Sequence, residues 1–157
     1  MANRRRKVNE IGKKLAKPLL TRHGYTSIQN LNDLNLNYPK KIHCTGFLAE
    51  RERVKYTILV EPRNKYERSG GLNTSYRLEE HCCRLADTLG KQLNAKGAWI
   101  AISLERKTFS AYFGLLSLLK GKLAIPMHQE GLDSYECLAK DESHEYDYDS
   151  FKNVDEE

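Results

Sequence analysis

The sequence predicts an α/β or α+β domain in which helices flank a mixed central sheet. Three observations lead to this fold class: an apolar stripe at helical spacing near the start, a longer one in the middle, and several short apolar runs suited to strands. With 157 residues, the chain is long enough for one hydrophobic core. We expect a disordered basic arm over residues 1–8, one domain over 9–140 and an acidic, disordered tail over 141–157.

The first helix is expected from about Asn9 to His23. Apolar residues recur there every three or four positions, Asn9 can cap the start, and Gly24 can end the helix. Pro18 lies inside this segment, and we expect it to kink or break the helix. The Asn-rich stretch that follows, 25–41, is typical of a short strand and an irregular loop.

Two antiparallel strands joined by a charged turn are predicted next. The first covers about 41–49, and the second contains the apolar run 56–60. That run ends in Glu61, Pro62 and Arg63, and because proline lacks a backbone N–H, we expect regular pairing to stop there. The second strand therefore delivers a carboxylate and then a guanidinium to the rim of the sheet.

The second half of the chain predicts one long helix and further strands. The helix, from about Tyr76 to Asn94, has the strongest amphipathic pattern in the sequence. Before it, the segment 64–75 contains Lys65, Arg68 and two glycines, and we expect a mobile basic loop of functional importance. The strands expected after the helix are 98–104, 108–114 and 123–127.

The net charge of +5 is unevenly distributed along the chain. Ten basic residues precede position 42 against only Glu10 and Asp33, whereas acids dominate from Asp141 onward. This asymmetry indicates a basic surface for a polyanion, and an acidic tail that solvates the chain or competes for that surface. The residues expected to contact nucleic acid, DNA in the first instance, are Arg4, Arg5, Arg6, Lys7, Lys13, Lys14, Arg63, Lys65 and Arg68.

Membrane and metal chemistry are not expected from composition and cysteine spacing. No apolar run is long enough to span a bilayer and the N-terminus lacks a hydrophobic leader, so we expect a cytoplasmic protein. The cysteines have no disulfide-framework or zinc-ribbon spacing, so reduced thiols are expected. A zinc site formed by His43, Cys44 and the run 81–83 is disfavoured, because consecutive helical residues diverge by about 100°. The four cysteines are Cys44, Cys82, Cys83 and Cys137.

Three features of the region 9–104 are similar to one known fold. They are the Gly-containing first helix (IGKKLA, 11–16), the Gly24-Tyr25 pair at its end, and a three-strand meander that leads through a long helix to another strand. The region resembles the PD-(D/E)XK restriction-endonuclease-like superfamily, its small Holliday-junction-resolvase-like members in particular. The resemblance implies an αβββαβ core, metal-dependent phosphodiester cleavage and, in many members, a homodimer.

The resemblance also implies a metal site made of an acid on the second strand, an acid-x-Lys on the third, and often a Glu on the first helix. Carboxylates in such a site hold Mg²⁺ or Mn²⁺ beside the scissile phosphate. This chain departs from that pattern on the second strand, where His43 and Cys44 stand in place of an acid. On the first helix the usual Glu appears as Lys13, with only Glu10 nearby.

Two registers of the third strand are compatible with the resemblance. If Glu61 is the acid, Arg63 replaces the lysine, and the two-residue period keeps both on one face of the sheet. If Glu61 stands in the place of the lysine, Leu59 replaces the acid and both functions are lost. In either register, one carboxylate is thin support for a hard divalent cation.

Three functions follow from these patterns. The leading one is a nucleic-acid-binding protein of nuclease-like fold that has lost its catalytic residues and needs no cofactor. The second is an active endonuclease that uses Mg²⁺ or Mn²⁺, with Glu61 as metal ligand, Arg63 as its catalytic partner and a relocated acid. The third is an interaction or inhibitor subunit that acts on a protein partner through residues 141–157. The candidates for the relocated acid are Glu10, Asp33 and Glu50.

Overall fold

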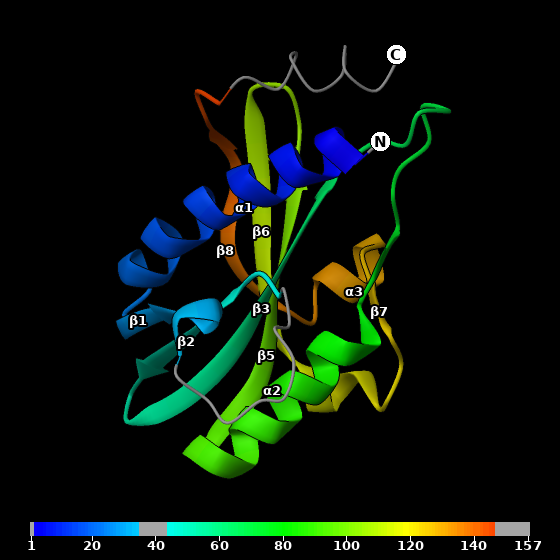
Figure 1. The fold of residues 1–157 in the computed structure, drawn as a ribbon. Coiled ribbons are helices and arrows are strands. Elements are labelled where there is room, and N and C mark those ends of the chain that lie inside the picture. The colour runs from blue at the N-terminus through cyan, green and yellow to red at the C-terminus, as the bar shows by residue number, and fades with distance from the viewer. Residues whose placement is uncertain (1, 35–43, 147–157) are drawn as a thin grey trace.

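A six-stranded mixed sheet forms the centre of the protein, as the computed structural model of residues 2–34 and 44–146 shows (Figure 1). Its strands lie in the order β1-β2-β3-β5-β6-β8, and neighbours run antiparallel except for the parallel pair β3 and β5. This confirms the predicted mixed sheet flanked by helices. The strands are β1 (Thr26–Asn30), β2 (Gly46–Arg51), β3 (Val54–Asn64), β5 (Ala95–Leu104), β6 (Thr108–Leu115) and β8 (Glu136–Ser143).

Helices cover both faces of this sheet. A second sheet of two short strands accompanies it. The helices are α1 (Ala2–Arg22), α2 (Glu80–Leu93) and α3 (Gln129–Leu132), with 3-10 turns η1 (Leu31–Asp33) and η2 (Leu116–Leu119). The second sheet pairs β4 (Ser75–Arg77) antiparallel with β7 (Ala124–Pro126). The expected strand at 123–127 is therefore present, whereas β4 was not anticipated.

Side-chain alternation along the central strands divides the core into two sides. Ile58 and Val60 of β3 pack with the apolar stripe of α1, whereas Leu59 between them packs with Leu85 and Leu89 of α2. Successive residues of a strand point to opposite faces, so one continuous apolar run supplies both layers. Glu61 and Arg63 have the same parity as Leu59 and therefore lie on the α2 side.

Helix α1 differs from its prediction in two places: it starts before Asn9, and it is not broken at Pro18. It begins at Ala2, so the backbone of 2–8 belongs to a helix rather than to a disordered arm. It also continues through Pro18, which is exposed. Proline removes the hydrogen bond to the carbonyl of Lys14, and on this exposed side of the helix water can satisfy that carbonyl.

The two segments expected to lack regular structure are more ordered than the sequence indicated. The basic loop after β3 contains an isolated bridge between Tyr66 and Leu72 before it enters β4. The acidic segment expected from 141 begins inside β8, which pairs with β6 as far as Ser143. The predictions for residues 147–157 and for His43 lie outside the described residues. Within the described ranges no helix has both the length and the apolar character needed to cross a membrane.

Candidate functional site

Strand β3 carries Glu61 and Arg63. The sequence predicted that regular pairing stops at Pro62, but the strand continues to Asn64. Its pairing with β2 ends before this point, whereas its parallel pairing with β5 runs to the last residue of the strand. Val60 donates its N–H toward β2, so Pro62, two residues later, directs its nitrogen past the end of β2. The missing N–H therefore interrupts no ladder bond, which explains why the strand tolerates a proline here.

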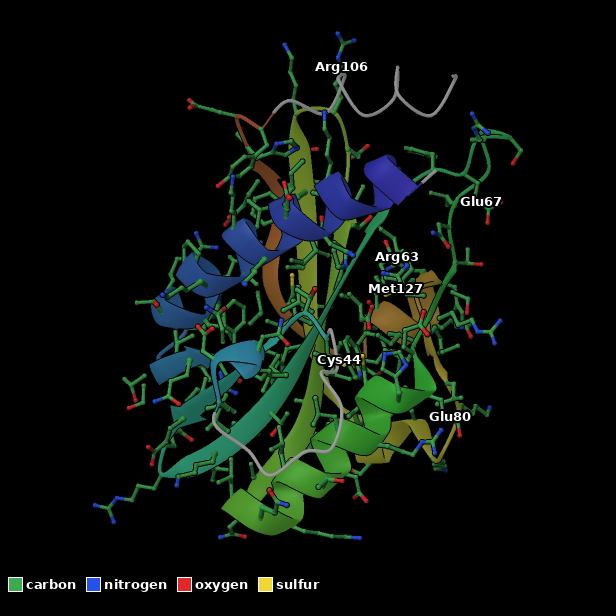
Figure 2. All side chains as sticks on the ribbon, in the orientation of Figure 1. Cys44, Arg63, Glu67, Glu80, Arg106 and Met127 are labelled. Atoms are coloured by element: carbon green, nitrogen blue, oxygen red, sulfur yellow. A yellow bond between two sulfur atoms is a disulfide. The ribbon has the colours of Figure 1, made fainter. Side chains whose placement is uncertain are left out.

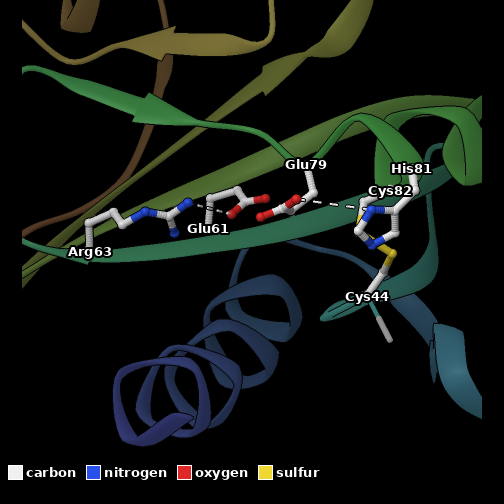
Figure 3. Close-up of a disulfide and its surroundings, with 6 residues drawn as sticks. All are labelled: Cys44, Glu61, Arg63, Glu79, His81 and Cys82. Atoms are coloured by element: carbon white, nitrogen blue, oxygen red, sulfur yellow. Dashed lines mark ion pairs between the residues drawn. A yellow bond between two sulfur atoms is a disulfide. The ribbon is translucent and has the colours of Figure 1, made fainter. Parts of the chain in front are cut away.

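Glu61 and Arg63 form an ion pair on the α2 side of the sheet, with 3.2 Å between Oε2 and Nη2 (Figure 3). Their side chains are only 12% and 20% exposed, respectively. The guanidinium also donates to the backbone carbonyls of Pro62 at 2.8 Å and Arg77 at 2.7 Å. Arg63 thus links β4 to β3 by a hydrogen bond. The N–H groups of its guanidinium that make these bonds point at the protein rather than at a phosphate in solvent.

Tyr76 of β4 closes one side of this ion pair. Its ring centroid lies 5.9 Å from the guanidinium carbon of Arg63, and the side chain is buried. Burial raises the pKa of Tyr76 to about 12, although a hydrogen bond with Ser103 and the charge of Arg63 oppose the rise. The phenol is therefore protonated at neutral pH and acts as a hydrogen-bonding and packing group.

Glu79 is a carboxylate near this pair that sequence reasoning missed. It immediately precedes α2, and Figure 3 shows its carboxylate pointing toward that of Glu61. Its Oε2 lies 4.0 Å from Nδ1 of His81. The signal available in the sequence was its position just before a strong helix, where the helix dipole favours negative charge.

A disulfide joins Cys44, in the segment leading into β2, to Cys82 in the first turn of α2, with 5.8 Å between the Cα atoms. This corrects the expectation of four reduced thiols. The two residues are 38 positions apart and carry no spacing motif, so only the packing of α2 against β3 and β5, beside the segment that leads into β2, brings them together. Cys83 and Cys137 are free thiols, and burial raises the pKa of Cys83, with a further contribution from the charge of Glu61.

His81 lies beside this disulfide and completes a group of three potential metal ligands. The ligand atoms of Cys44, His81 and Cys82 are all within 4.8 Å of one another. Cys83 is not part of the group, in agreement with the divergence expected of consecutive helical residues. Cys44 approaches from a different element, so only two of the three ligands come from the helix.

The acids that the nuclease resemblance implies do not gather around Glu61 in the described part of the chain. Continuing the β2–β3 register places the disulfide-bonded Cys44 opposite Glu61. Glu50 pairs in that register with Lys55, near the start of β3, and Asp33 belongs to η1. At about 3.3 Å per strand residue, Glu50 is roughly 20 Å from Glu61 along the strand.

The first-helix candidates lie on the other side of the sheet. Gly12 packs directly on Pro62, whose side chain points to the α1 side. Figure 3 shows α1 below β3 and the Glu61 carboxylate above it. Glu10 and Lys13 therefore belong to a different face from Glu61. Glu61 is already paired with Arg63, and the neighbouring Glu79 contacts His81. These two engaged carboxylates do not fit the multi-oxygen shell of Mg²⁺ or Mn²⁺.

Three segments that are distant in the sequence meet at the carboxyl end of the parallel strands (Figure 1). They are the first half of α1, the loop 65–74 after β3, and the turn 105–107 between β5 and β6. The backbone N–H of Lys65 donates to Leu104, and its ammonium lies 3.6 Å from the carboxylate of Glu105. These contacts hold the loop against the turn.

The end of β8 connects the same turn to α1. His144 is buried, and its backbone N–H and Nε2 contact the carbonyls of Lys107 and Glu105 at 2.9 and 2.8 Å. Tyr146 stacks on His144, and Lys14 of α1 lies 5.8 Å from the Tyr146 ring centroid. A continuous chain of contacts therefore runs from the turn to α1.

We call this surface the basic end. Figure 2 shows Arg106 at the tip of the β5–β6 turn and Glu67 in the neighbouring loop, at the same end of the molecule. Arg106 and Lys107 were missed from the sequence, because a cation in a short turn looks like ordinary solvated surface. Arg4, Arg5 and Arg6 lie in the first turns of α1, and their side chains are outside the description. We define the basic end by the cations of these three segments whose side chains are described, Lys7, Lys13, Lys14, Lys65, Arg68, Arg106 and Lys107; the same segments also carry Glu10, Glu67 and Glu105.

Comparison with known proteins adds no assignment. No family model, no curated protein and no solved structure matches this chain. The fold defines an α+β domain with a mixed sheet, and its function has to be argued from the basic end and from the surroundings of Glu61.

Proposed function

We propose that this protein binds nucleic acid, DNA in the first instance, through the basic end and without metal-dependent cleavage. The observation that carries the proposal is the convergence of three basic segments at the carboxyl ends of β3 and β5. Ligands of open sheets commonly bind outside the carboxyl ends of parallel strands. Clustered Lys and Arg side chains attract phosphates and release their counterions, which favours binding.

The proposal includes a nuclease-like ancestry for the fold. It is supported by the chain order α1, β1, β2, β3, α2, β5, in which β3 and β5 are parallel, with the short β4 inserted before α2. The loss of catalysis is supported by the ion pair of Glu61 with Arg63 and by the cysteine opposite Glu61. The guanidinium of Arg63 beside Glu61 disfavours a second positive charge there.

Two exposed tyrosines suggest which form of nucleic acid binds best. Tyr66 is 47% exposed with Lys65 Nζ 5.6 Å from its ring, and Tyr146 is 36% exposed beside Lys14. Aromatic rings next to cations stack on unpaired bases, at about 1–3 kcal/mol per base. We therefore expect single strands, or junctions and ends with unpaired bases, to bind more tightly than a blunt duplex.

The test is a titration of labelled single-stranded, duplex and branched DNA and RNA in EDTA at several salt concentrations. Lys14→Glu and Lys107→Glu should each weaken binding, and each lost phosphate contact should lower the salt slope by about 0.9 on duplex DNA and about 0.7 on single strands. The matched control is Lys55→Glu with Lys96→Glu, the same charge change at the opposite ends of β3 and β5. Equal losses in both sets, or no binding by the unaltered protein, would overturn the basic end as the binding surface.

Arg63 is a poor choice for such a charge reversal, because its removal also breaks the contacts that hold β4.

The same titration with Mg²⁺ or Mn²⁺ separates binding from the nuclease alternative. Cleavage that requires metal and disappears in Glu61→Gln would show an active site and contradict the proposed loss of catalysis. To test the tail as a protein-partner segment, truncation should follow Tyr146, since a cut after Lys140 would remove part of β8.

A further inference from the structure

We propose that Cys44, Cys82 and His81 form a Zn²⁺ site when the disulfide between the two cysteines is reduced. The three ligand atoms lie within 4.8 Å of one another in the disulfide form. Two thiolates and one imidazole are a ligand set that zinc prefers, and such three-ligand sites keep a fourth position open for water. The site is separate from the basic end and does not depend on the proposed nucleic-acid binding.

The packing around the two cysteines keeps them close together in either redox state. Cys44 and Cys82 are buried in one apolar cluster with Leu59 of β3 and Leu85 of α2. Two sulfurs bound to one zinc at about 2.3 Å in tetrahedral geometry are roughly 3.8 Å apart. Opening the disulfide therefore requires the sulfurs to separate by a small rotation of side chains, with no rearrangement of the strand or the helix.

His81 supplies the third ligand from the solvent side. Its side chain is 52% exposed, so the ring can turn toward the sulfurs without displacing core residues, and water can reach the open position. Figure 3 shows the ring between Glu79 and the disulfide, with Nδ1 directed at the Glu79 carboxylate at 4.0 Å. A carboxylate on one imidazole nitrogen orients the other nitrogen toward a metal. Glu79 is thus a positioning residue for His81.

The chemistry of the switch balances with a two-electron reductant. A dithiol transfers two electrons and two protons to the Cys44–Cys82 bond, giving two thiols and a cyclic disulfide of the reductant. Zn²⁺ then replaces the two thiol protons, which are released to solvent, and the two thiolates neutralise the charge of the ion. In a reducing compartment, where disulfides are uncommon, the metal-bound form is the one expected.

The experiment uses the full chain reduced with a trialkylphosphine, which becomes a phosphine oxide, and Co²⁺ as a spectroscopic probe. We expect one Co²⁺ per chain, with a sulfur-to-cobalt charge-transfer band and tetrahedral d–d bands that stoichiometric Zn²⁺ abolishes. The disulfide form should bind no Co²⁺ in this way. Cys44→Ser and His81→Ala should abolish the charge-transfer band or weaken Co²⁺ binding by more than tenfold, and Glu79→Gln should weaken it by about tenfold.

Cys83→Ser and Cys137→Ser are the matched controls, because they remove thiols outside the group. Both should bind Co²⁺ like the unaltered protein. Circular dichroism establishes that each variant is folded, and His81→Ala keeps the test decisive because an exposed side chain is removed. The proposal is overturned if the reduced protein binds no Co²⁺ stoichiometrically, or if Cys83→Ser and His81→Ala have equal effects. Either result leaves the proposed nucleic-acid binding untouched.

Discussion

Arg63 and Glu61 stand two residues apart on β3 and face each other at 3.2 Å, on the side of the sheet covered by α2. Arg63 occupies the position where the nuclease resemblance implies a lysine that stabilises developing charge. Here the cation holds β4 through the carbonyl of Arg77 and neutralises the neighbouring carboxylate. The contacts of Arg63 in the structure are therefore structural ones.

Replacing Arg63 should therefore lower stability. Arg63→Met removes the hydrogen bonds to two carbonyls and the partner of a mostly buried carboxylate, and we expect a loss of about 1–3 kcal/mol in the free energy of unfolding. Urea denaturation followed by circular dichroism measures this. The control is Arg84→Met, which breaks an exposed helical pair with Glu80 and should cost at most about 0.5 kcal/mol. Equal losses in the two variants would contradict the structural role of Arg63.

The contact between α1 and β3 provides a second prediction. A Cβ atom at Gly12 would lie 2.5 Å from the Cβ and Cγ atoms of Pro62, whose ring cannot move aside. Gly12→Ala should destabilise the protein by about 1–3 kcal/mol through overpacking, even though alanine favours a helix by about 1 kcal/mol over glycine. Lys17→Ala, on the exposed side of α1, is the control and should change stability by less than about 0.5 kcal/mol. A more stable Gly12→Ala protein would show that α1 does not pack this closely.

A pH-dependent prediction comes from Arg51 and Glu136. The guanidinium of Arg51 donates to both carboxylate oxygens at 2.9 Å and lies 4.4 Å from the ring centroid of Tyr25. These hydrogen bonds lower the pKa of Glu136 from its ordinary value of 4.5. The pair therefore stabilises the fold fully above pH 4.5, and the contribution is lost as the pH falls through the lower pKa of the folded state.

Glu136→Gln should remove this contribution, about 1 kcal/mol at pH 7 because the Glu136 side chain is 38% exposed and water screens the pair. The difference between the two proteins should shrink at acid pH, where Glu136 is protonated. Denaturant unfolding at pH 7 and at progressively lower pH measures both values. Glu142→Gln, which removes a single exposed contact to Arg22, should give a smaller difference at neutral pH. A constant difference at all pH values would refute the assignment.

Reduction of the Cys44–Cys82 disulfide should also lower stability. The loop that it closes spans 38 residues, and chain entropy assigns about 3–4 kcal/mol to a cross-link of that length. Thermal unfolding in EDTA, with and without reductant, measures the effect. Cys82→Ala should lower the unfolding temperature and should no longer respond to reductant. If the reductant destabilises Cys82→Ala as much as the unaltered protein, the bond does not contribute in this way.

The long amphipathic and apolar segments could be located from the sequence because their patterns are local. The α2 stripe, the β5 run and the three-strand meander are examples in which spacing alone identifies the element. β4 and β7 have three residues each and depend on each other for pairing, so neither has a pattern of its own. In β8 only Leu138 and Ala139 are buried. Two apolar residues are too few for a strand pattern, and the acidic residues that follow them were interpreted as the start of a disordered tail.

The candidate site was only partly predictable for a related reason. The sequence identified Glu61, Arg63 and most of the basic residues, because charge and strand ends are visible along the chain. The disulfide and the position of Glu79 depend on how α2 packs on β3 and β5, and no local sequence pattern encodes that packing. Arg106 and Lys107 become candidate binding residues only because the fold places the β5–β6 turn beside the loop after β3.

The parallel pairing of β3 with β5 has a consequence for how the chain folds. Every partner lies 40 positions further along, from Lys55 with Ala95 to Asn64 with Leu104. During synthesis α1 and the β1–β2–β3 meander emerge first, so α1 can cover Ile58 and Val60. The face of β3 that carries Leu59 and the edge that pairs with β5 stay uncovered until α2 and β5 have left the ribosome. Pairing across such a distance requires a large loop to close, so folding should be slow for a domain of this size. Until that step, the exposed edge of β3 is the place where nascent chains would associate with one another.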